Sequence, residues 1–354
     1  MTAADFGCEC FDKGDVAEEG TKAQETCSST SEECDSVSWH GNFYTKATAD
    51  APPILQLDAV PSRHVLCECN EMCACATSKC SNAVVRHGVR IPLRVQPVRD
   101  SPESPAGTKA QSSGLGVFAA APIRKGQFIC EYAGELLSPT EARRRWSRQA
   151  SQKQGNYILT IYETASSSAF EASEQELEEV SQLDPGSAPS LGGSRIDIDP
   201  REEGNVARFI NHLCPPLANV VIAPVRCDGP LLLQTHSNAA KQPEIEPLSE
   251  YLHRLRISPL TNQNFPQSAK RLVPAPPRAA LFAARDIAAG EQLGFDYADP
   301  TQLKGKTDVA ALTSKPPSEG LQQQELRTRC LCGSVACRGW LPFDEQTDPA
   351  FPMD

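Results

Sequence analysis

The 354-residue sequence contains no apolar run approaching the roughly 18 residues that a membrane-spanning helix requires. Its first residues, Met1 to Gly7, lack both the basic stretch and the apolar stretch of a secretory signal peptide. We therefore expect neither a membrane protein nor a secreted one. With 40% hydrophobic residues the chain can bury one substantial core and carry a smaller module, while 29 prolines and 22 glycines indicate many loops.

Positive charge is scarce near the N-terminus. Residues 1–60 contain three Lys or Arg against twelve Asp or Glu, and residues 171–184 contain six acidic residues and no basic one. The net charge of −11 is concentrated in these two stretches. Such acidic flanks disfavour contact with DNA phosphates, so we predict no direct sequence-specific DNA binding, and they suit a basic polypeptide partner. Alternatively, the acidic stretches only keep the chain in solution.

Cysteine, in contrast, is abundant, and fifteen thiols without a signal peptide favour metal binding over disulfides. Nine of them lie in residues 1–88, at Cys8, Cys10, Cys27, Cys34, Cys67, Cys69, Cys73, Cys75 and Cys80. Nine thiolates satisfy three tetrahedral zinc ions if three of them each bridge two ions. We predict that this three-zinc cluster holds together a module with too little apolar pattern for a core of its own. Two mononuclear sites with a spare thiol, or disulfides, are the alternatives.

Downstream of a predicted linker at 89–113, the apolar pattern predicts short strands with little helix. Strands are expected from Val117 and within 127–135, 156–162, 195–199, 219–226, 279–284 and 292–297, with one or two helical turns in 205–212. Ser138-Pro139-Thr140-Glu141 is a capping box that predicts a helix to about Gln149. Polar residues at 164–194 and 228–278 indicate insertions, and 299–328 indicates a second linker. The predicted fold class is mostly β.

Several motifs follow one another in a distinctive order: Gly114-Leu115-Gly116, Glu131-Tyr132-Ala133-Gly134-Glu135, Asn156-Tyr157, Arg208-Phe209-Ile210-Asn211-His212-Leu213-Cys214 and Gly294-Phe295-Asp296-Tyr297. This order resembles that of SET-domain protein lysine methyltransferases. The Cys-rich flanks are similar to the pre-SET and post-SET modules of that family's suppressor-of-variegation branch. The resemblance implies a SET-domain β-clip fold with a knot-like crossing, where the Asn-His-Cys segment meets the final Tyr strand. It divides the chain into a pre-SET zinc-cluster module at 1–88, a SET domain at 114–298 and a small zinc post-SET module at 329–345.

The resemblance also implies S-adenosylmethionine as cofactor, contacted by Gly114, Leu115, Gly116, Tyr157, Arg208, Asn211 and His212. Tyr297 would lie at the point of methyl transfer, with Tyr132 and Phe295 lining a channel for the target lysine. For each aromatic ring, ordinary packing in the core is the alternative. In this family a Phe at the position of Phe295 leaves room for di- or trimethylation.

The resemblance further implies a fourth zinc ion held by Cys214, Cys330, Cys332 and Cys337. The remaining thiols, Cys130 and Cys227, are interpreted as buried. The implied substrate is the histone H3 tail, with its ninth-position lysine favoured, and with it a role on chromatin in the nucleus. Methylation of a non-histone lysine, or a catalytically silent chromatin scaffold that keeps the zinc modules, are the alternatives.

Overall fold

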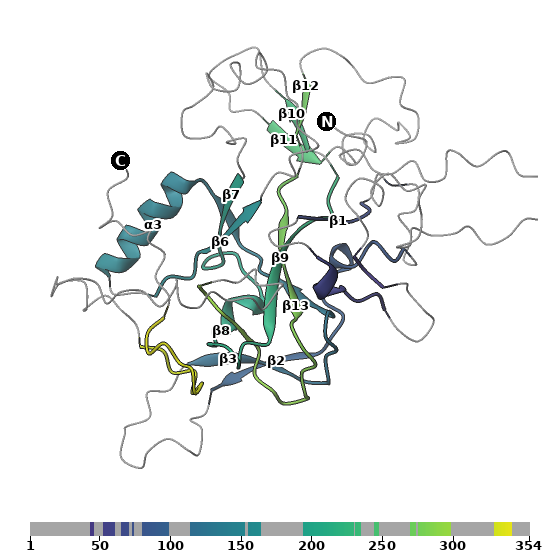
Figure 1. Ribbon diagram of the computed structural model, residues 1–354. Helices are drawn as coiled ribbons and strands as arrows, with labels where there is room; N and C mark the ends of the chain where they lie inside the picture. Colours follow the sequence, from purple (N-terminus) through teal and green to yellow (C-terminus); the bar gives the residue numbers. More distant parts are fainter. Residues whose placement is uncertain are drawn as a thin grey trace, which may run out of the picture. The chain divides into compact units, whose positions relative to one another are not determined.

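The computed structural model describes residues 43–45, 52–60, 65–70, 73, 80–98, 114–152, 155–163, 194–229, 231–234, 244–247, 270–273, 275–298 and 329–341 (Figure 1). Over these ranges the regular structure is mainly strand, with one α-helix, so the predicted mostly β fold class is confirmed. None of the helices in these ranges has the length and apolar character needed to cross a membrane. The chain divides into two compact units, the first of Met1–Gln56, Val65–Gly88 and Val225–Arg278, and the second of Leu57–His64, Val89–Pro224 and Ala279–Asp354.

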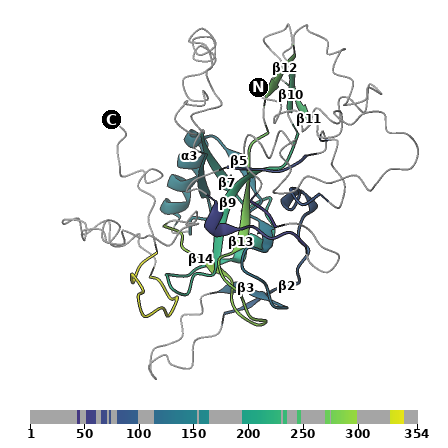
Figure 2. The same ribbon diagram turned by 45° about the vertical axis from the view of Figure 1, so that its right-hand side comes forward.

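The core of the second unit is built on two strands that are apolar along their length. β9 (Val220–Arg226) and β13 (Arg278–Ala283) run side by side in both views (Figures 1 and 2). On its other edge, β13 pairs antiparallel with β4 (Phe128–Glu131). Nearly every residue of β9 and β13 is buried, as expected of strands that are apolar without alternation. Their side chains pack with those of neighbouring loops, including Ile123, Ile287 and Leu293. These strands coincide with those predicted at 219–226 and 279–284.

A second sheet in this unit carries the helix. It has the order β5-β7-β6, made by β5 (Glu135–Leu137), β7 (Ser194–Asp199) and β6 (Leu159–Glu163). Helix α3 (Pro139–Ser151) starts as predicted, with Glu141 N–H donating to Ser138 Oγ at 3.3 Å. Arg145 on this helix contacts the carboxylates of Glu135, Glu141 and Asp199. The buried Asp199 gives this guanidinium a fixed partner on β7, which anchors the helix to the sheet.

Two small sheets complete the second unit. β2 (Leu93–Pro97), in the segment predicted as a linker, pairs antiparallel with β3 (Leu115–Ala119). β8 (Asn211–His212) pairs in parallel with β14 (Gly294–Phe295), and the predicted helical turn before it is a 3-10 helix, η3 (Val206–Phe209). Another 3-10 helix, η1, spans Leu57–Ala59.

The first unit contains the remaining elements. β1 (Leu66–Cys67) pairs in parallel with the last residues of β9, and η2 spans Val85–His87. β10 (Leu231–Gln234) pairs antiparallel with both β11 (Glu244–Pro247) and β12 (Lys270–Val273). The segment predicted as the second insertion therefore contributes a three-stranded sheet, which the polar composition of 228–278 did not reveal.

The carboxylate of Glu68, which is 3% exposed, organises the first unit. It accepts the N–H groups of Val84 (2.9 Å) and Val85 (3.0 Å) and the hydroxyl of Tyr44 (2.7 Å). These donors come from the start of η2 and from the distant segment containing Tyr44, so one buried group joins both to the residue that follows β1. A buried polar group of this kind stabilises the fold only while all its partners remain in place.

Substitution Glu68→Gln should loosen the first unit, because the amide has one acceptor oxygen where the carboxylate has two, so one of the three donors meets an N–H group instead. Leaving such a donor unpaired costs about 1–3 kcal/mol. We expect the amide protons of Val84 and Val85 to exchange with deuterium roughly tenfold faster or more. Glu202→Gln, the same change at an exposed position, is the control. Unchanged protection of both amides in Glu68→Gln would show that the carboxylate is not needed.

Candidate active site and metal site

The site forms where two short segments from distant parts of the chain cross. β8 and β14 pair so that Asn211 lies opposite Gly294 and His212 opposite Phe295. A Cβ at Gly294 would collide with the side chain of Leu213, so only glycine allows this approach. The predicted meeting of the Asn-His-Cys segment with the final Tyr strand is therefore confirmed. β14 is shorter than the strand predicted at 292–297, because Tyr297 N–H donates to a side chain instead of a strand.

Asn219 holds the crossing in register from a fully buried position. Its Nδ2 donates to Gln292 O (2.8 Å) and Glu291 Oε1 (3.0 Å), and its Oδ1 accepts Gly294 N–H (3.0 Å). Its backbone N–H also donates to Gly294 O at 3.0 Å. Every polar atom of the amide is thus used to fix the entry to β14. Sequence reasoning did not identify this role, because only the packed structure shows which backbone groups need a partner.

Tyr297, at the end of this crossing, is held through both its backbone and its side chain. Its N–H donates to His212 Nδ1 (3.1 Å) and its hydroxyl donates to Ile210 O (2.8 Å). Its ring lies 4.8 Å from that of Phe295 and 5.2 Å from that of His212. Tyr297 is therefore fixed against β8, with its phenol oxygen still able to accept hydrogen bonds.

Tyr132 supplies a second buried phenol, whose hydroxyl donates to Tyr157 O at 2.7 Å. Burial raises the pKa of Tyr132 well above its usual value, and the nearby Tyr297 raises it further. Burial of the phenol oxygen likewise raises the pKa of Tyr297, although 38% of the residue's surface is exposed. Both phenols are thus neutral at physiological pH, so they serve as hydrogen-bonding groups and not as bases.

Several of the predicted cofactor-contacting residues come from separate segments that a hydrogen bond joins. Asn211 Nδ2 donates to Leu115 O at 3.0 Å, which joins β8 to the segment containing Gly114 and Gly116. Gly114 has a φ of 73°, a conformation that favours glycine. Leu115 and Tyr157 are 45% and 46% exposed, so their surfaces are available to a ligand.

Arg208, on η3, is the predicted cofactor residue with an unused donor. Its Nη1 donates to Arg201 O (3.2 Å) and its guanidinium lies 5.4 Å from the centre of the Phe209 ring. Its Nε is buried and has no hydrogen-bond partner among the residues that the structure describes. A buried guanidinium N–H of this kind suits an anionic group such as a ligand carboxylate.

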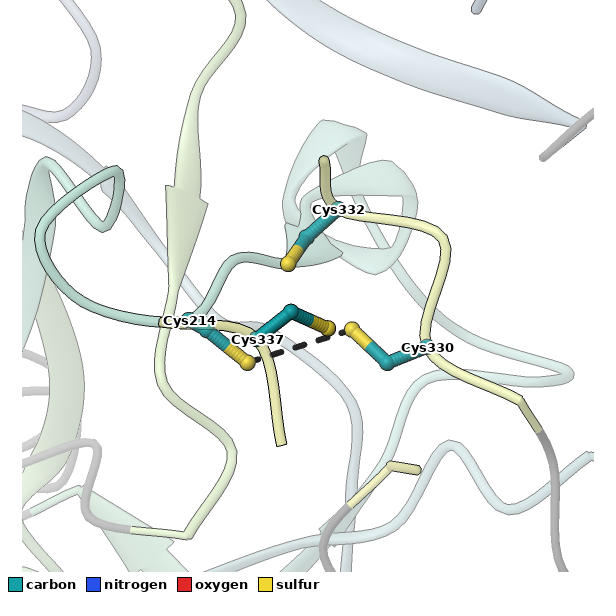
Figure 3. A group of neighbouring side chains, drawn as sticks. All are labelled: Cys214, Cys330, Cys332 and Cys337. Atoms are coloured by element: carbon teal, nitrogen blue, oxygen red, sulfur yellow. Dashed lines mark hydrogen bonds between the residues drawn. The ribbon is translucent and has the colours of Figure 1, made fainter. Parts of the chain in front are cut away.

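Four cysteines converge beside the crossing, as predicted. The sulfur atoms of Cys214, Cys330, Cys332 and Cys337 point toward one another and all lie within 4.8 Å (Figure 3). Cys214 and Cys330 Sγ are 3.9 Å apart. A tetrahedral zinc ion with Zn–S bonds of about 2.3 Å separates its sulfur ligands by about 3.8 Å. The donor set and the spacing therefore fit a closed structural zinc site.

The segment 329–341, here called the tail, is attached by more than these sulfurs. Ser334 Oγ donates to Pro215 O at 2.9 Å, next to Cys214. Arg338 forms an ion pair with the buried Asp296, between Phe295 and Tyr297. His212 Nε2 lies 3.1 Å from Cys214 Sγ, and burial lowers the pKa of His212. Sequence reasoning assigned no role to Asp296, although it lies within the last motif, or to Arg338, which directly follows Cys337.

The predicted ligands of the three-zinc cluster are only partly described. Cys67, Cys69, Cys73 and Cys80 belong to the first unit, and all but Cys67 are buried. Asn70 N–H donates to Cys73 Sγ (3.3 Å) and Asn82 Nδ2 to Cys69 Sγ (3.7 Å), as expected around thiolates. The five other predicted ligands, Cys8, Cys10, Cys27, Cys34 and Cys75, lie outside the described residues. The cluster therefore stays a prediction.

The two cysteines not assigned to metal behave as predicted. Cys130 and Cys227 are buried, and burial raises the pKa of the Cys130 thiol to about 12. These thiols belong to the packed interior and not to the site.

Comparison with known proteins identifies relatives of this chain. The family model described as SET domain matches residues 114–246. The human protein named Histone-lysine N-methyltransferase SETMAR is 28% identical over 279 residues, which cover 78% of this chain and 27% of that protein. Histone-lysine N-methyltransferase SUVR3 of Arabidopsis thaliana is 31% identical over 277 residues, which cover 78% of this chain and 52% of that protein.

Among solved structures, the methyltransferase domain of human SETMAR has a similar fold. The TM-score is 0.52 at 22% identity, covering 96% of this chain and 81% of that chain. The chain spans 27% of the human SETMAR protein and 60% of the mouse one. Residues 114–246 are therefore a SET domain, in a chain that is similar over more than three quarters of its length to proteins named histone-lysine N-methyltransferases.

Proposed function

We propose that this protein is an S-adenosylmethionine-dependent methyltransferase acting on protein lysine, with histone H3 as its substrate. The observation that carries the proposal is the placement of Tyr297 at the crossing of β8 and β14, held by His212 and Ile210 and packed against Phe295. The names of the relatives support the same reaction and the same class of substrate.

The cofactor, when bound, supplies a methyl group already activated on a sulfonium, so the protein contributes alignment. Asn211 and the Gly114 to Gly116 segment are joined by the bond to Leu115 O, and Tyr157 adds exposed surface. The unpartnered Nε of Arg208 suits the carboxylate of the cofactor. Holding two reactants in a productive arrangement contributes about 7–11 kcal/mol to lowering a barrier of this kind.

The target amine must be neutral when it accepts the methyl group. A lysine with a pKa of about 10.4 needs ~4.6 kcal/mol to lose its proton at pH 7. The buried rings of Tyr132 and Phe295 disfavour the ammonium form, as does the positive charge of the cofactor. The phenol oxygens of Tyr132 and Tyr297, whose hydrogens are used elsewhere, are free to accept the amine N–H groups and orient its lone pair. No carboxylate base is required.

Within the histone class, we infer the ninth-position lysine of H3 as the preferred target and chromatin in the nucleus as the place of action. The resemblance to the suppressor-of-variegation branch supports this choice, as does the relative named Su(var)3-9 in Drosophila melanogaster, which is 27% identical over 272 residues. A basic tail also suits the acidic stretches of the sequence. A peptide array spanning the histone tails would decide between this lysine and others.

Substitution Tyr297→Phe should lower kcat for methyl transfer to an H3 peptide by about 100-fold or more. Loss of the hydroxyl removes the bond to Ile210 O and the acceptor for the amine, and misplacement of a reacting group by about 1 Å has a cost of this size. Transfer of a radiolabelled methyl group measures the rate.

Tyr44→Phe, which removes a buried phenol hydroxyl from the first unit, is the matched control for Tyr297→Phe. It should lose stability and keep the rate. A Tyr297→Phe rate within a few-fold of wild type would reject the role of the phenol. A folded wild-type protein that methylates no lysine peptide would favour the silent scaffold.

The number of methyl groups added to the lysine provides a separate prediction, which concerns Phe295. Phe295 is 3% exposed and its ring lies beside that of Tyr297. In the family that the sequence resembles, a Phe at this position leaves room for methylated amines. We expect the wild-type protein to yield di- and trimethyl-lysine and Phe295→Tyr to stop earlier, because the added hydroxyl fills the channel. Mass spectrometry of the products decides it: a wild-type ladder ending at monomethyl-lysine would contradict the assignment.

Metal content tests both zinc assignments together. We expect about four zinc ions per purified chain, three in the cluster of the first unit and one among Cys214, Cys330, Cys332 and Cys337. Cys332→Ser should remove one ion and leave three, whereas Cys130→Ser, at a buried thiol outside the sites, should leave all four. A wild-type content clearly below four would contradict the cluster, and an unchanged count in Cys332→Ser would contradict the tail site.

A further inference from the structure

The side chain of His212 lies between the four sulfurs and Tyr297, and both of its ring nitrogens are engaged. Nδ1 accepts the backbone N–H of Tyr297 at 3.1 Å, and Nε2 lies 3.1 Å from Cys214 Sγ. The imidazole is 1% exposed, so water does not compete for either nitrogen. One ring therefore touches both a predicted metal ligand and the backbone of the residue at the point of methyl transfer.

These two contacts fix the position of the ring hydrogen. A neutral imidazole has one N–H and one acceptor nitrogen. Because Nδ1 accepts from Tyr297, the hydrogen is on Nε2 and points at Cys214 Sγ. A ligand thiolate is a charged acceptor, and a hydrogen bond to it is stronger than one between neutral groups. The metal site therefore favours the tautomer that leaves Nδ1 available to Tyr297.

A second connection links the tail to the same segment. Arg338 directly follows Cys337 and pairs with Asp296, whose Oδ1 also accepts the N–H of Ala298 at 3.0 Å. Asp296, which directly precedes Tyr297, thus holds Ala298, which directly follows it, and Asp296 is itself held by Arg338 of the tail. His212 and Arg338 approach Tyr297 from the two parts of the chain that the four cysteines join.

We propose that His212 is a positioning residue that couples the four-cysteine metal site to Tyr297. It donates Nε2–H to the Cys214 thiolate and accepts Tyr297 N–H at Nδ1, so metal retention and placement of the phenol depend on one ring. The part of this proposal that is tested by kcat rests on the proposed methyltransferase function. The part that is tested by zinc release does not.

Two substitutions separate the contacts. In His212→Asn the amide oxygen takes the place of Nδ1, but the side chain is too short to reach Cys214. In His212→Gln the amide nitrogen takes the place of Nε2, while the acceptor for Tyr297 is lost. We expect zinc release to a chelator to accelerate about 10–100-fold in His212→Asn and to stay near the wild-type rate in His212→Gln. With zinc in excess, kcat should fall further in His212→Gln than in His212→Asn.

The chain is expected to hold several zinc ions, so the release phase of the four-cysteine site must be assigned. It is the phase that is missing in Cys332→Ser. Equal release rates in wild type and His212→Asn would overturn the proposal, and so would equal effects of the two substitutions on both readouts. If wild type methylates no peptide, the proposed function fails, while the zinc release rates still decide the coupling.

A measurement on the wild-type protein tests the proposal even if the variants do not fold. In the zinc-loaded, ¹⁵N-labelled chain, long-range ¹H–¹⁵N correlations of the His212 ring report which nitrogen carries the hydrogen. We expect the Nε2–H form. An Nδ1–H ring would be incompatible with the Tyr297 contact and would overturn the proposal.

Discussion

The parallel pairing of β8 with β14 is the contact on which the rest of the site depends. It joins two-residue strands that are separated by more than eighty residues of sequence, so it gains little from its own hydrogen bonds. Its stability comes from what surrounds it: the buried amide of Asn219, the absence of a side chain at Gly294, and the core below β9 and β13. A short pairing held in this way is fixed in register, because any shift leaves buried polar groups without partners.

The same crossing separates two kinds of chemistry by a few residues. One involves neutral phenols and aromatic rings, whose burial disfavours charge and so would disfavour the ammonium form of the proposed lysine substrate. The other involves four sulfurs, whose closed arrangement suits a cation. His212 and Cys214 belong to one short segment, so residues two positions apart contact both environments.

Much of this was predictable from sequence, for reasons that differ between elements. The capping box fixed the start of α3, because its signal is local and nothing in the packing opposes it. β9 and β13 were predictable from apolar runs, and the gathering of Cys214 with the tail cysteines from the family resemblance that the order of the motifs carries. The strands β10 to β12 were not, because their segment is polar overall and strand pairing depends on partners far away in sequence. Asn219, Asp296 and Arg338 were missed for a related reason: a buried polar role is defined by the groups that it meets.

In the proposed zinc site, the metal would serve the proposed active site as well as the fold of the tail. Val335 is fully exposed and Leu331 half exposed, so the described tail buries few apolar side chains of its own. Hydrophobic burial cannot hold such a segment against its conformational entropy. The remaining contacts are the ion pair of Arg338 with Asp296, the bond from Ser334 to Pro215 O and the four sulfurs. Of these, only ligation of the proposed metal ion by the four sulfurs would supply the free energy to order thirteen residues. Because Asp296 lies directly before Tyr297, ordering the tail also orders the backbone that carries the phenol.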